Sequence, residues 1–181
     1  KWVGDVDKLK DKKYGANHWP ENAVLPMQRQ DKINREHMKA NEDMPQHKTF
    51  SLGLEFLERN HDAKNDWYLQ IETFDPHEPF FTQQEFQDLY PHEYAGPPFD
   101  WPPYREVRED DETVEHIRYM YASLISFCDQ QLGRVLDFFD KFNMWDDTML
   151  IVNTDHGFLM GEHDWWAKVV SPFFQEIAHI P

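Results

Sequence analysis

The feature that most constrains the fold is one apolar stripe through residues 114–142. Apolar side chains recur there at steps of three and four residues, at Val114, Ile117, Tyr121, Leu124, Cys128, Leu132, Val135, Phe139 and Phe142. This spacing puts them on one face of an α-helix of about nine turns. Because a helix with such a face must bury it against other elements, the stripe predicts a packed domain around a long helix.

Further signals lie at the ends and in the middle of this expected helix. Acidic residues 110–112 stand at its start and Lys141 near its end, as the helix dipole favours. Gly133 is an interior weak point that costs about 1 kcal/mol relative to alanine. Cys128 lies on the stripe, so we interpret it as a small buried residue rather than a nucleophile. As the single cysteine, it also excludes an internal disulfide and a Cys-based zinc cluster.

Two segments are predicted to form strands. One precedes the long helix in the sequence, and the other follows it. In residues 67–74, the side chains of Trp67, Leu69, Ile71 and Thr73 alternate with those of Tyr68, Gln70, Glu72 and Phe74. This alternation, with its aromatic and β-branched residues, predicts a strand. Residues 148–153 (Thr-Met-Leu-Ile-Val-Asn) are a continuous apolar run, which predicts a strand buried on both faces. A long helix followed by a buried strand favours an α/β sheet.

The N-terminal part of the chain is more polar. Residues 1–48 are interrupted by glycine and proline, and we expect an irregular surface excursion with one short helix near residues 30–41. Residues 49–60 repeat apolar residues at helical spacing and predict a helix, with Thr49 as its N-cap.

Composition excludes several classes of protein. The 181 residues suit one domain, and an aromatic content of 15% excludes disorder of the whole chain. The formal net charge of -16 argues against binding of nucleic acid. No apolar run approaches the about 18 residues that a membrane span needs.

Two polar clusters follow the expected strands, at the edge where open α/β sheets bind ligands. The first is residues 75–80 (Asp-Pro-His-Glu-Pro-Phe), where prolines fix the backbone on both sides of His77 and so aim its imidazole. An ordinary turn capped by Asp75 is the alternative interpretation.

The second cluster runs from Thr154 to Lys168. Asp155 and His156 are adjacent and can both reach one cation. Carboxylate oxygen suits calcium or magnesium, whereas imidazole nitrogen better tolerates manganese, zinc or iron. Lys168 can hold an anion as a point charge. An acidic turn without a ligand is the alternative interpretation.

Taken in order, these motifs resemble the sulfatase family of the alkaline-phosphatase superfamily. The resemblance is carried by residues 132–136 (Leu-Gly-Arg-Val-Leu), 148–157, 161–163 (Gly-Glu-His), Lys168 and the stretch 171–181, with residues 75–80 similar to the family's central histidine loop. Ordered matches begin near Thr49, and residues 1–48 match only loosely. The resemblance implies an alkaline-phosphatase-like α/β sandwich with a mainly parallel sheet flanked by helices, of which residues 49–181 form the central part.

The resemblance also implies roles for particular residues. Asp155 and His156 are expected to bind a divalent metal, most often Ca²⁺, with Mg²⁺ or Mn²⁺ also possible. His77 and Lys168 are expected to contact the sulfate oxygens during hydrolysis of a sulfate monoester. His163 is a further substrate-binding candidate, or else makes a loop hydrogen bond. Glu162 is interpreted as a support for this loop.

The departures from the family pattern matter as much as the match. The Cys/Ser-x-Pro-x-Arg motif, whose Cys or Ser becomes the formylglycine nucleophile, does not occur in the sequence. The paired aspartates of the family's N-terminal part are missing as well. We therefore expect the chain to be an internal part of a longer protein, inactive alone, with formylglycine upstream of Lys1. The expected partner is a small-molecule or saccharide sulfate ester, and neither the oligomeric state nor the compartment is assigned.

Two alternatives stay open. A phosphonate monoester or phosphodiester hydrolase of the same superfamily is one, since the imidazole of His156 favours transition metals. A non-catalytic module that binds an anion or a partner is the other, with the aromatic, proline-rich loop of residues 90–104 as its exposed surface.

Overall fold

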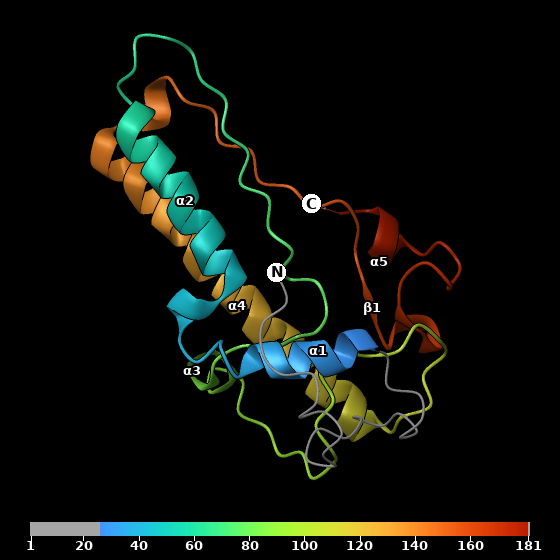
Figure 1. The fold of residues 1–181 in the computed structure, drawn as a ribbon. Helices are drawn as coiled ribbons and strands as arrows, with labels where there is room; N and C mark the ends of the chain where they lie inside the picture. Colours follow the sequence, from blue (N-terminus) through green and yellow to red (C-terminus); the bar gives the residue numbers. More distant parts are fainter. Residues whose placement is uncertain (1–25, 181) are drawn as a thin grey trace.

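The computed structural model describes residues 26–180, and helices dominate it (Figure 1). The elements in chain order are α1 (Pro26–Arg35), η3 (Asn41–Asp43), α2 (Pro45–Asn60), α3 (Gln84–Gln87), α4 (Asp111–Phe142), η4 (Met144–Asp146), β1 (Leu159–Met160), η5 (Glu162–Asp164), β2 (Trp166–Ala167) and α5 (Gln175–Ala178). Here η denotes a 3₁₀-helix.

The long helix predicted from the apolar stripe is confirmed as α4. Asp110 is its N-cap, and its side chain accepts a hydrogen bond from the backbone N–H of Thr113. The helix ends at Asn143, which adopts the left-handed conformation common after helix ends, with φ 53°. Local sequence therefore defines both ends of this element.

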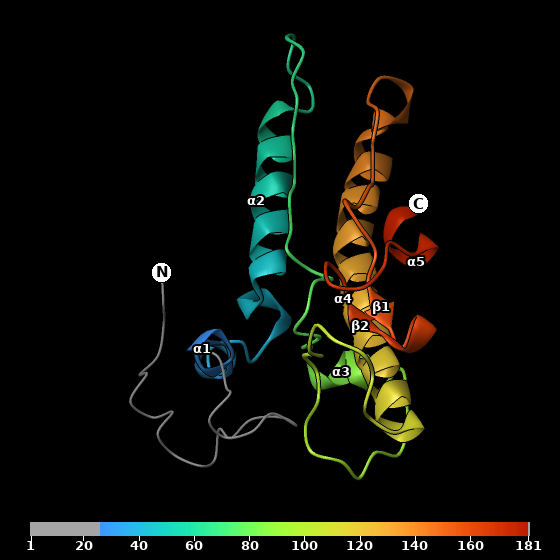
Figure 2. The same ribbon diagram turned by 90° about the vertical axis from the view of Figure 1, so that its right-hand side faces the viewer.

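Helix α2 lies beside α4, and the two run in the same direction (Figures 1 and 2). The prediction of a helix over residues 49–60 is confirmed, but the N-cap at Thr49 is wrong. The helix begins at Pro45, and Met44 is the N-cap. Proline suits the first helical position because the backbone N–H that it lacks has no partner there.

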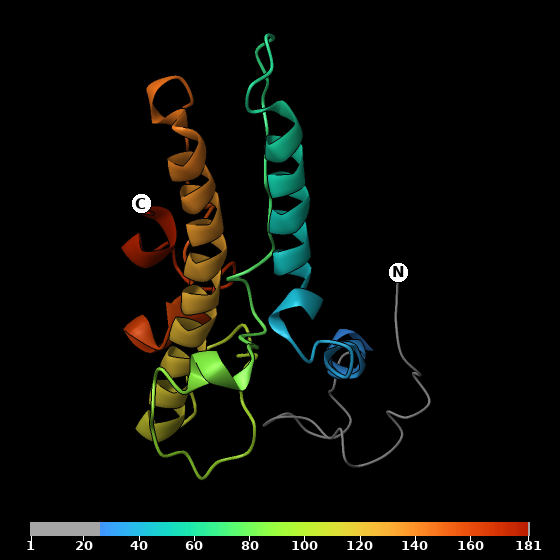
Figure 3. The ribbon, with the colours of Figure 1, turned by 90° about the vertical axis from the view of Figure 1, so that its left-hand side faces the viewer.

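Residues 29–48 combine exposed and half-buried side chains with a few buried ones, so part of the expected surface excursion contacts the core. The predicted short helix lies earlier than expected, as α1, and Figure 3 shows it below the lower end of α2. Ile33 is 0% exposed and Met44 4%, so apolar burial holds this stretch against the rest. The other part of that expectation, residues 1–25, lies outside the described residues.

Two apolar clusters occupy the two ends of α4. The cluster at its C-terminal half contains Leu57, Val135, Phe138, Phe139 and Met144. The other comprises Met44, Phe80, Phe86, Phe99, Ile117, Met120, Leu124, Phe127, Trp166 and Ala167. Because Phe99 is 1% exposed, the proline-rich loop contributes to the core, which corrects its interpretation as an exposed surface at this residue.

The two predicted strands are absent from residues 26–180. Residues 67–74 do alternate between half-buried and exposed side chains as expected, but form no ladder. In residues 148–153 the expected burial fails as well, because Met149, Ile151 and Val152 are 83%, 72% and 63% exposed. A buried strand needs neighbours that satisfy its backbone and cover both of its faces. Within the described residues Leu150 packs against the cluster at the end of α4, but no strand pairs with this segment.

The sheet that does form is small. Strands β1 and β2 pair antiparallel, with Leu159 opposite Ala167 and Met160 opposite Trp166. The described part of the chain thus contains no parallel sheet. Within residues 26–180, no helix has both the length and the apolar character that crossing a bilayer requires.

Candidate functional site

His77 is held in the loop that follows residues 67–74. Its Nδ1–H donates a hydrogen bond to the backbone carbonyl of Glu78 at 2.7 Å, and its ring stacks on Phe74 with centroids 4.1 Å apart. Phe80, fully buried, anchors the loop, and its N–H donates to the Asp100 carbonyl at 2.7 Å. With Nδ1 used in this way, Nε2 is the ring nitrogen available to another group.

The carboxylate of Glu78 lies at the centre of the site and is only 2% exposed. Tyr104 donates its hydroxyl hydrogen to Oε1. Nδ1 of His77 lies 3.1 Å from Oε2, and Nζ of Lys168 lies 3.8 Å from the same oxygen. Oε2 itself is buried without a hydrogen-bond partner. Three separate segments therefore converge on one buried carboxylate.

Lys168 stands in a tight turn next to β2. Ala167 and Val169, its neighbours, have φ of 67° and 74°, and the N–H of Val170 donates to the carbonyl of Lys168 at 2.9 Å. Positive φ is unfavourable for a β-branched residue and costs about 1–3 kcal/mol. Trp166, fully buried, anchors the turn, and so the surrounding packing over-determines the backbone at Lys168.

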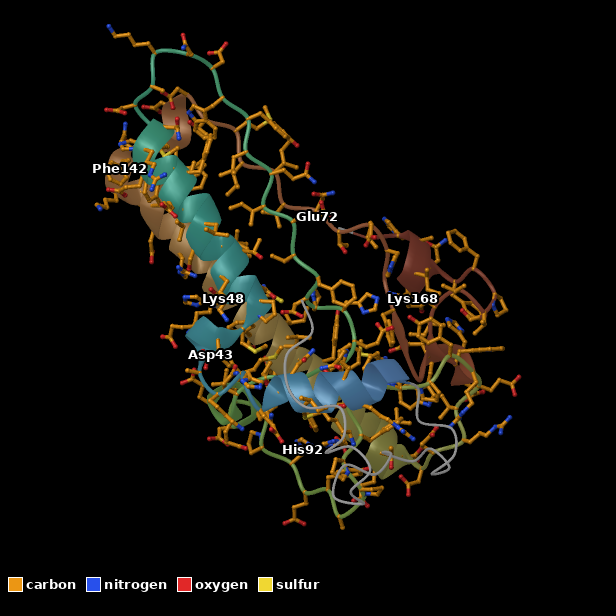
Figure 4. The ribbon with its side chains drawn as sticks, viewed as in Figure 1. Asp43, Lys48, Glu72, His92, Phe142 and Lys168 are labelled. Carbon is orange, nitrogen blue, oxygen red and sulfur yellow. The ribbon has the colours of Figure 1, made fainter. Side chains whose placement is uncertain are left out.

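The electrostatics of Lys168 connect the two polar clusters of the sequence. Its side chain is 9% exposed, and burial lowers the pKa of its ammonium group. The carboxylates of Glu78 and Asp155 act in the opposite direction and favour the charged form. Figure 4 shows Lys168 beside the C-terminal part of the chain, well away from Phe142 at the far end of α4. The field of Asp155 thus reaches the same ammonium group as that of Glu78.

Asp155 and His156, the predicted metal ligands, lie at the end of the extended segment 148–154. The Asp155 side chain is 87% exposed, and Nε2 of His156 lies 3.8 Å from its Oδ1. Because Nδ1–H of His156 donates to the Gly157 carbonyl at 2.8 Å, Nε2 is left with its lone pair.

This donor set suits a divalent cation but does not complete a coordination shell. Residues 26–180 contain no group of three or more His, Cys, Asp or Glu side chains arranged around one ion position. Ca²⁺ takes about 6–8 oxygen ligands. A metal bound by Asp155 and His156 therefore requires further ligands from other groups.

His163 and Glu162 serve the loop rather than meeting His77. The ring of His163 stacks on Phe174 with centroids 3.9 Å apart, and its Nε2 lies 3.1 Å from the carboxylate of Glu176. Glu162 accepts a hydrogen bond from the N–H of Met160 at 2.6 Å. These contacts tie residues 159–163 to the segment that contains α5.

Two further titratable groups lie near the site. Cys128 is half-buried and donates a weak hydrogen bond to Oε1 of Gln46. Burial raises its pKa to about 12, which does not suit a nucleophile. Burial also raises the pKa of Asp75 to about 6.

Sequence reasoning missed Tyr104, because Tyr104 lies far from Glu78 along the chain and no local pattern relates the two residues.

Comparison with known proteins decides the family. The family model described as Sulfatase matches residues 1–175, nearly the whole chain. The chain belongs to the sulfatase family. The resemblance found from the motifs is confirmed, and the match also includes residues 1–48, which resemble the family only loosely by inspection. Sulfatase membership implies an alkaline-phosphatase-like α/β fold for the domain.

Three relatives are 26–37% identical to the chain over the residues that align with it. Human iduronate 2-sulfatase is 26% identical over 165 residues, which cover 76% of this chain and 30% of the relative. Choline-sulfatase of Rhizobium meliloti is 28% identical over 141 residues, covering 68% and 27%. The multifunctional alkaline phosphatase superfamily protein PehA of Trinickia caryophylli is 37% identical over 60 residues, covering 33% and 12%. The chain thus spans less than a third of the length of these relatives.

Proposed function

We propose that the protein hydrolyses a sulfate monoester and that His77 and Lys168 bind the sulfate group. The observation that carries the proposal is the convergence of both side chains on buried Glu78, with Asp155 acting on the same ammonium group. The sulfatase match and the named sulfatases among the relatives support the reaction class.

The reaction needs positive charge that is placed in advance. Negative charge builds on the sulfuryl oxygens as the ester bond breaks, and fixed donors stabilise it best where water is excluded. Lys168 supplies an ammonium group in a buried position, and His77 offers Nε2 while its Nδ1 stays hydrogen-bonded. Since the chain carries a net charge of -16, this local positive charge is what attracts an anionic ester.

The metal and the nucleophile complete the proposal. Asp155 and His156 hold a divalent cation, with Ca²⁺ preferred, which supplies Lewis-acid polarisation of a sulfuryl oxygen when bound. The nucleophile is a formylglycine located upstream of residue 1, since the sequence lacks its motif. Peptide mass spectrometry of the natural protein tests this: an aldehyde in place of an upstream Cys or Ser supports it, and an unmodified nucleophile contradicts it.

We also propose that residues 67–74 and 148–153 are strands of a parallel sheet in the complete domain. Both segments run in the same direction, and α4 connects them, as in a βαβ unit (Figures 1 and 2). The alternating burial of residues 67–74 and the exposed apolar side chains of residues 148–153 support strands that pair with other parts of the protein.

Replacement of Lys168 tests the proposed function. In the natural protein, Lys168→Ala should lower kcat/KM for an aryl sulfate by about 100-fold or more, because a preplaced charge on the transferring group is lost. Lys141→Ala is the matched control, since Lys141 is an exposed lysine in the last turn of α4. Equal turnover in the two variants would remove Lys168 from the site. An inactive wild-type protein that binds sulfate would favour the binding module.

A phosphonate monoester or phosphodiester hydrolase is the second candidate. The similarity to a relative named as a multifunctional alkaline phosphatase superfamily protein favours it, as does an imidazole among the proposed metal ligands. Relative kcat/KM on aryl sulfate and aryl phosphonate, with the metal content of the purified protein, distinguishes the two. Faster phosphonate cleavage with a bound transition metal would replace the sulfatase proposal.

A further inference from the structure

We infer that Glu78 is the positioning residue of this site, holding Lys168 and His77 in place for an anionic ester. The inference rests on the proposed function. It assigns a role to a carboxylate that has no expected contact with substrate or metal. The three groups around Glu78 come from its own loop, from the end of the proline-rich loop and from the turn after β2.

Burial makes this carboxylate depend on its neighbours. A charged group that is 2% exposed has lost most of its contact with water and must be compensated by donors and by opposite charge. Tyr104 supplies a donor to Oε1. Lys168 supplies the opposite charge near Oε2, and removal of either partner would leave an uncompensated charge in the interior.

The spacing leaves both sulfate-binding groups free to act. Nζ of Lys168 lies 3.8 Å from Oε2, which is an ion pair but longer than a hydrogen bond, so this contact uses none of the three N–H donors. His77 turns Nδ1 toward Glu78, and Nε2 therefore lies at the opposite edge of the ring. Glu78 thus orients Lys168 through its carboxylate, and it holds His77 through its backbone carbonyl with the carboxylate close by. Neither contact occupies the atoms that would meet the ester.

The orienting effect matters most for Lys168. A lysine carries four flexible methylene groups, and an ammonium group that can move loses much of its value for a defined oxygen position. The backbone turn at residues 167–169 fixes where the side chain starts, and Glu78 fixes where it ends. No other carboxylate of residues 26–180 forms an ion pair with Lys168.

The test compares two carboxylates in the natural protein. Glu78→Gln keeps the shape and the acceptor for Tyr104 but removes the charge. We expect kcat/KM for an aryl sulfate to fall about 10- to 100-fold, as for residues that orient a binding group. Glu72→Gln is the matched control, because Glu72 is exposed on the neighbouring extended segment (Figure 4) and should leave activity unchanged.

A second measurement separates positioning from stability alone. The melting temperature of the wild-type protein should rise with added inorganic sulfate, because a ligand that binds the folded state stabilises it. Glu78→Gln should lose most of this rise, and Glu72→Gln should keep it. A merely structural role for Glu78 would lower the melting temperature without changing its dependence on sulfate.

The outcomes separate the inference from the proposed function. Wild-type turnover with equal activity and equal sulfate response in Glu78→Gln and Glu72→Gln would overturn the inference and leave the function intact. A wild-type protein without turnover would overturn the function, and the inference with it. If Glu78→Gln fails to fold, Tyr104→Phe decides: a loss of about 3- to 10-fold supports the inference, and wild-type activity overturns it.

Discussion

At the scale of single residues, Asp75 shows how the site loop responds to pH. Burial raises the pKa of its carboxyl group from 3.8 to about 6, so the folded state holds a proton that the unfolded state releases between these values. Stability from this group is therefore present below pH 3.8 and is lost as the pH rises to about 6. Above that pH, an ionised carboxylate in a half-buried position opposes folding.

Asp75→Asn should therefore stabilise the protein at neutral pH and have little effect in acid. We expect a gain of up to about 3 kcal/mol in the free energy of unfolding at pH 7.5, from about 1.4 kcal/mol per pKa unit. Denaturant unfolding of wild type and variant at pH 4 and pH 7.5 measures it. The other carboxylates contribute equally to both proteins, so their effect cancels in the difference in free energy of unfolding. A difference that does not change with pH would contradict the raised pKa of Asp75.

At the scale of elements, the neighbouring helices α2 and α4 each contain an interior glycine, and the two glycines have different structural roles. Gly133 in α4 has open space where a Cβ atom would stand, with nothing within 4 Å. Gly53 in α2 lies against residues 67–74, and a Cβ atom there would meet Cδ1 of Ile71 at 2.5 Å. In α2 the glycine makes room for the extended segment; in α4 it only weakens the helix.

Gly133→Ala should raise the free energy of unfolding by about 0.5–1 kcal/mol, because alanine loses less backbone entropy on folding than glycine. Gly53→Ala is the matched control. It gains the same helix propensity but must displace Ile71, so we expect no gain or a loss. Thermal or denaturant unfolding of both variants measures the effect. Equal gains in the free energy of unfolding would show that the side chain of Ile71 can move away from α2 at no cost.

At the scale of the whole molecule, the described residues combine a packed helical body with extended segments that lack strand partners. Fully buried Phe80, Ile117 and Leu124 define the body. Along residues 148–153, by contrast, Met149, Ile151 and Val152 are exposed, which is unusual for a stable surface. The arrangement fits a chain that spans less than a third of its relatives' length.

Hydrogen exchange tests the proposed parallel sheet. In the natural protein, amides of residues 148–153 should exchange slowly, because a strand within a sheet donates its N–H groups to neighbours. In residues 1–181 alone, the same amides should exchange within seconds, while those of α4 stay protected in both. Mass-spectrometric exchange of peptides from this region provides the measurement. Fast exchange in both proteins would exclude a sheet there.

The sequence by itself determined the features that depend on local spacing. The stripe of α4, the alternation of residues 67–74 and the order of the motifs around His77 and Lys168 are readable without contacts, and the motif order led to the family. Helix spacing is local because each turn follows from its own backbone. Proline is common at the first helical position, so Pro45 also indicates the start of α2. The prediction instead follows the hydroxyl of Thr49, which is a common N-cap group.

Only the tertiary structure decided which side chains meet. The convergence of His77, Tyr104 and Lys168 on Glu78 joins segments that no periodicity relates. The structure likewise shows that residues 148–153 form no ladder within residues 26–180, although their apolar run predicts a buried strand. An apolar run indicates that a segment can be buried but not which neighbours would bury it. Contacts between distant segments depend on how the whole chain closes its core, and for that reason the carboxylate that organises the site became visible only in three dimensions.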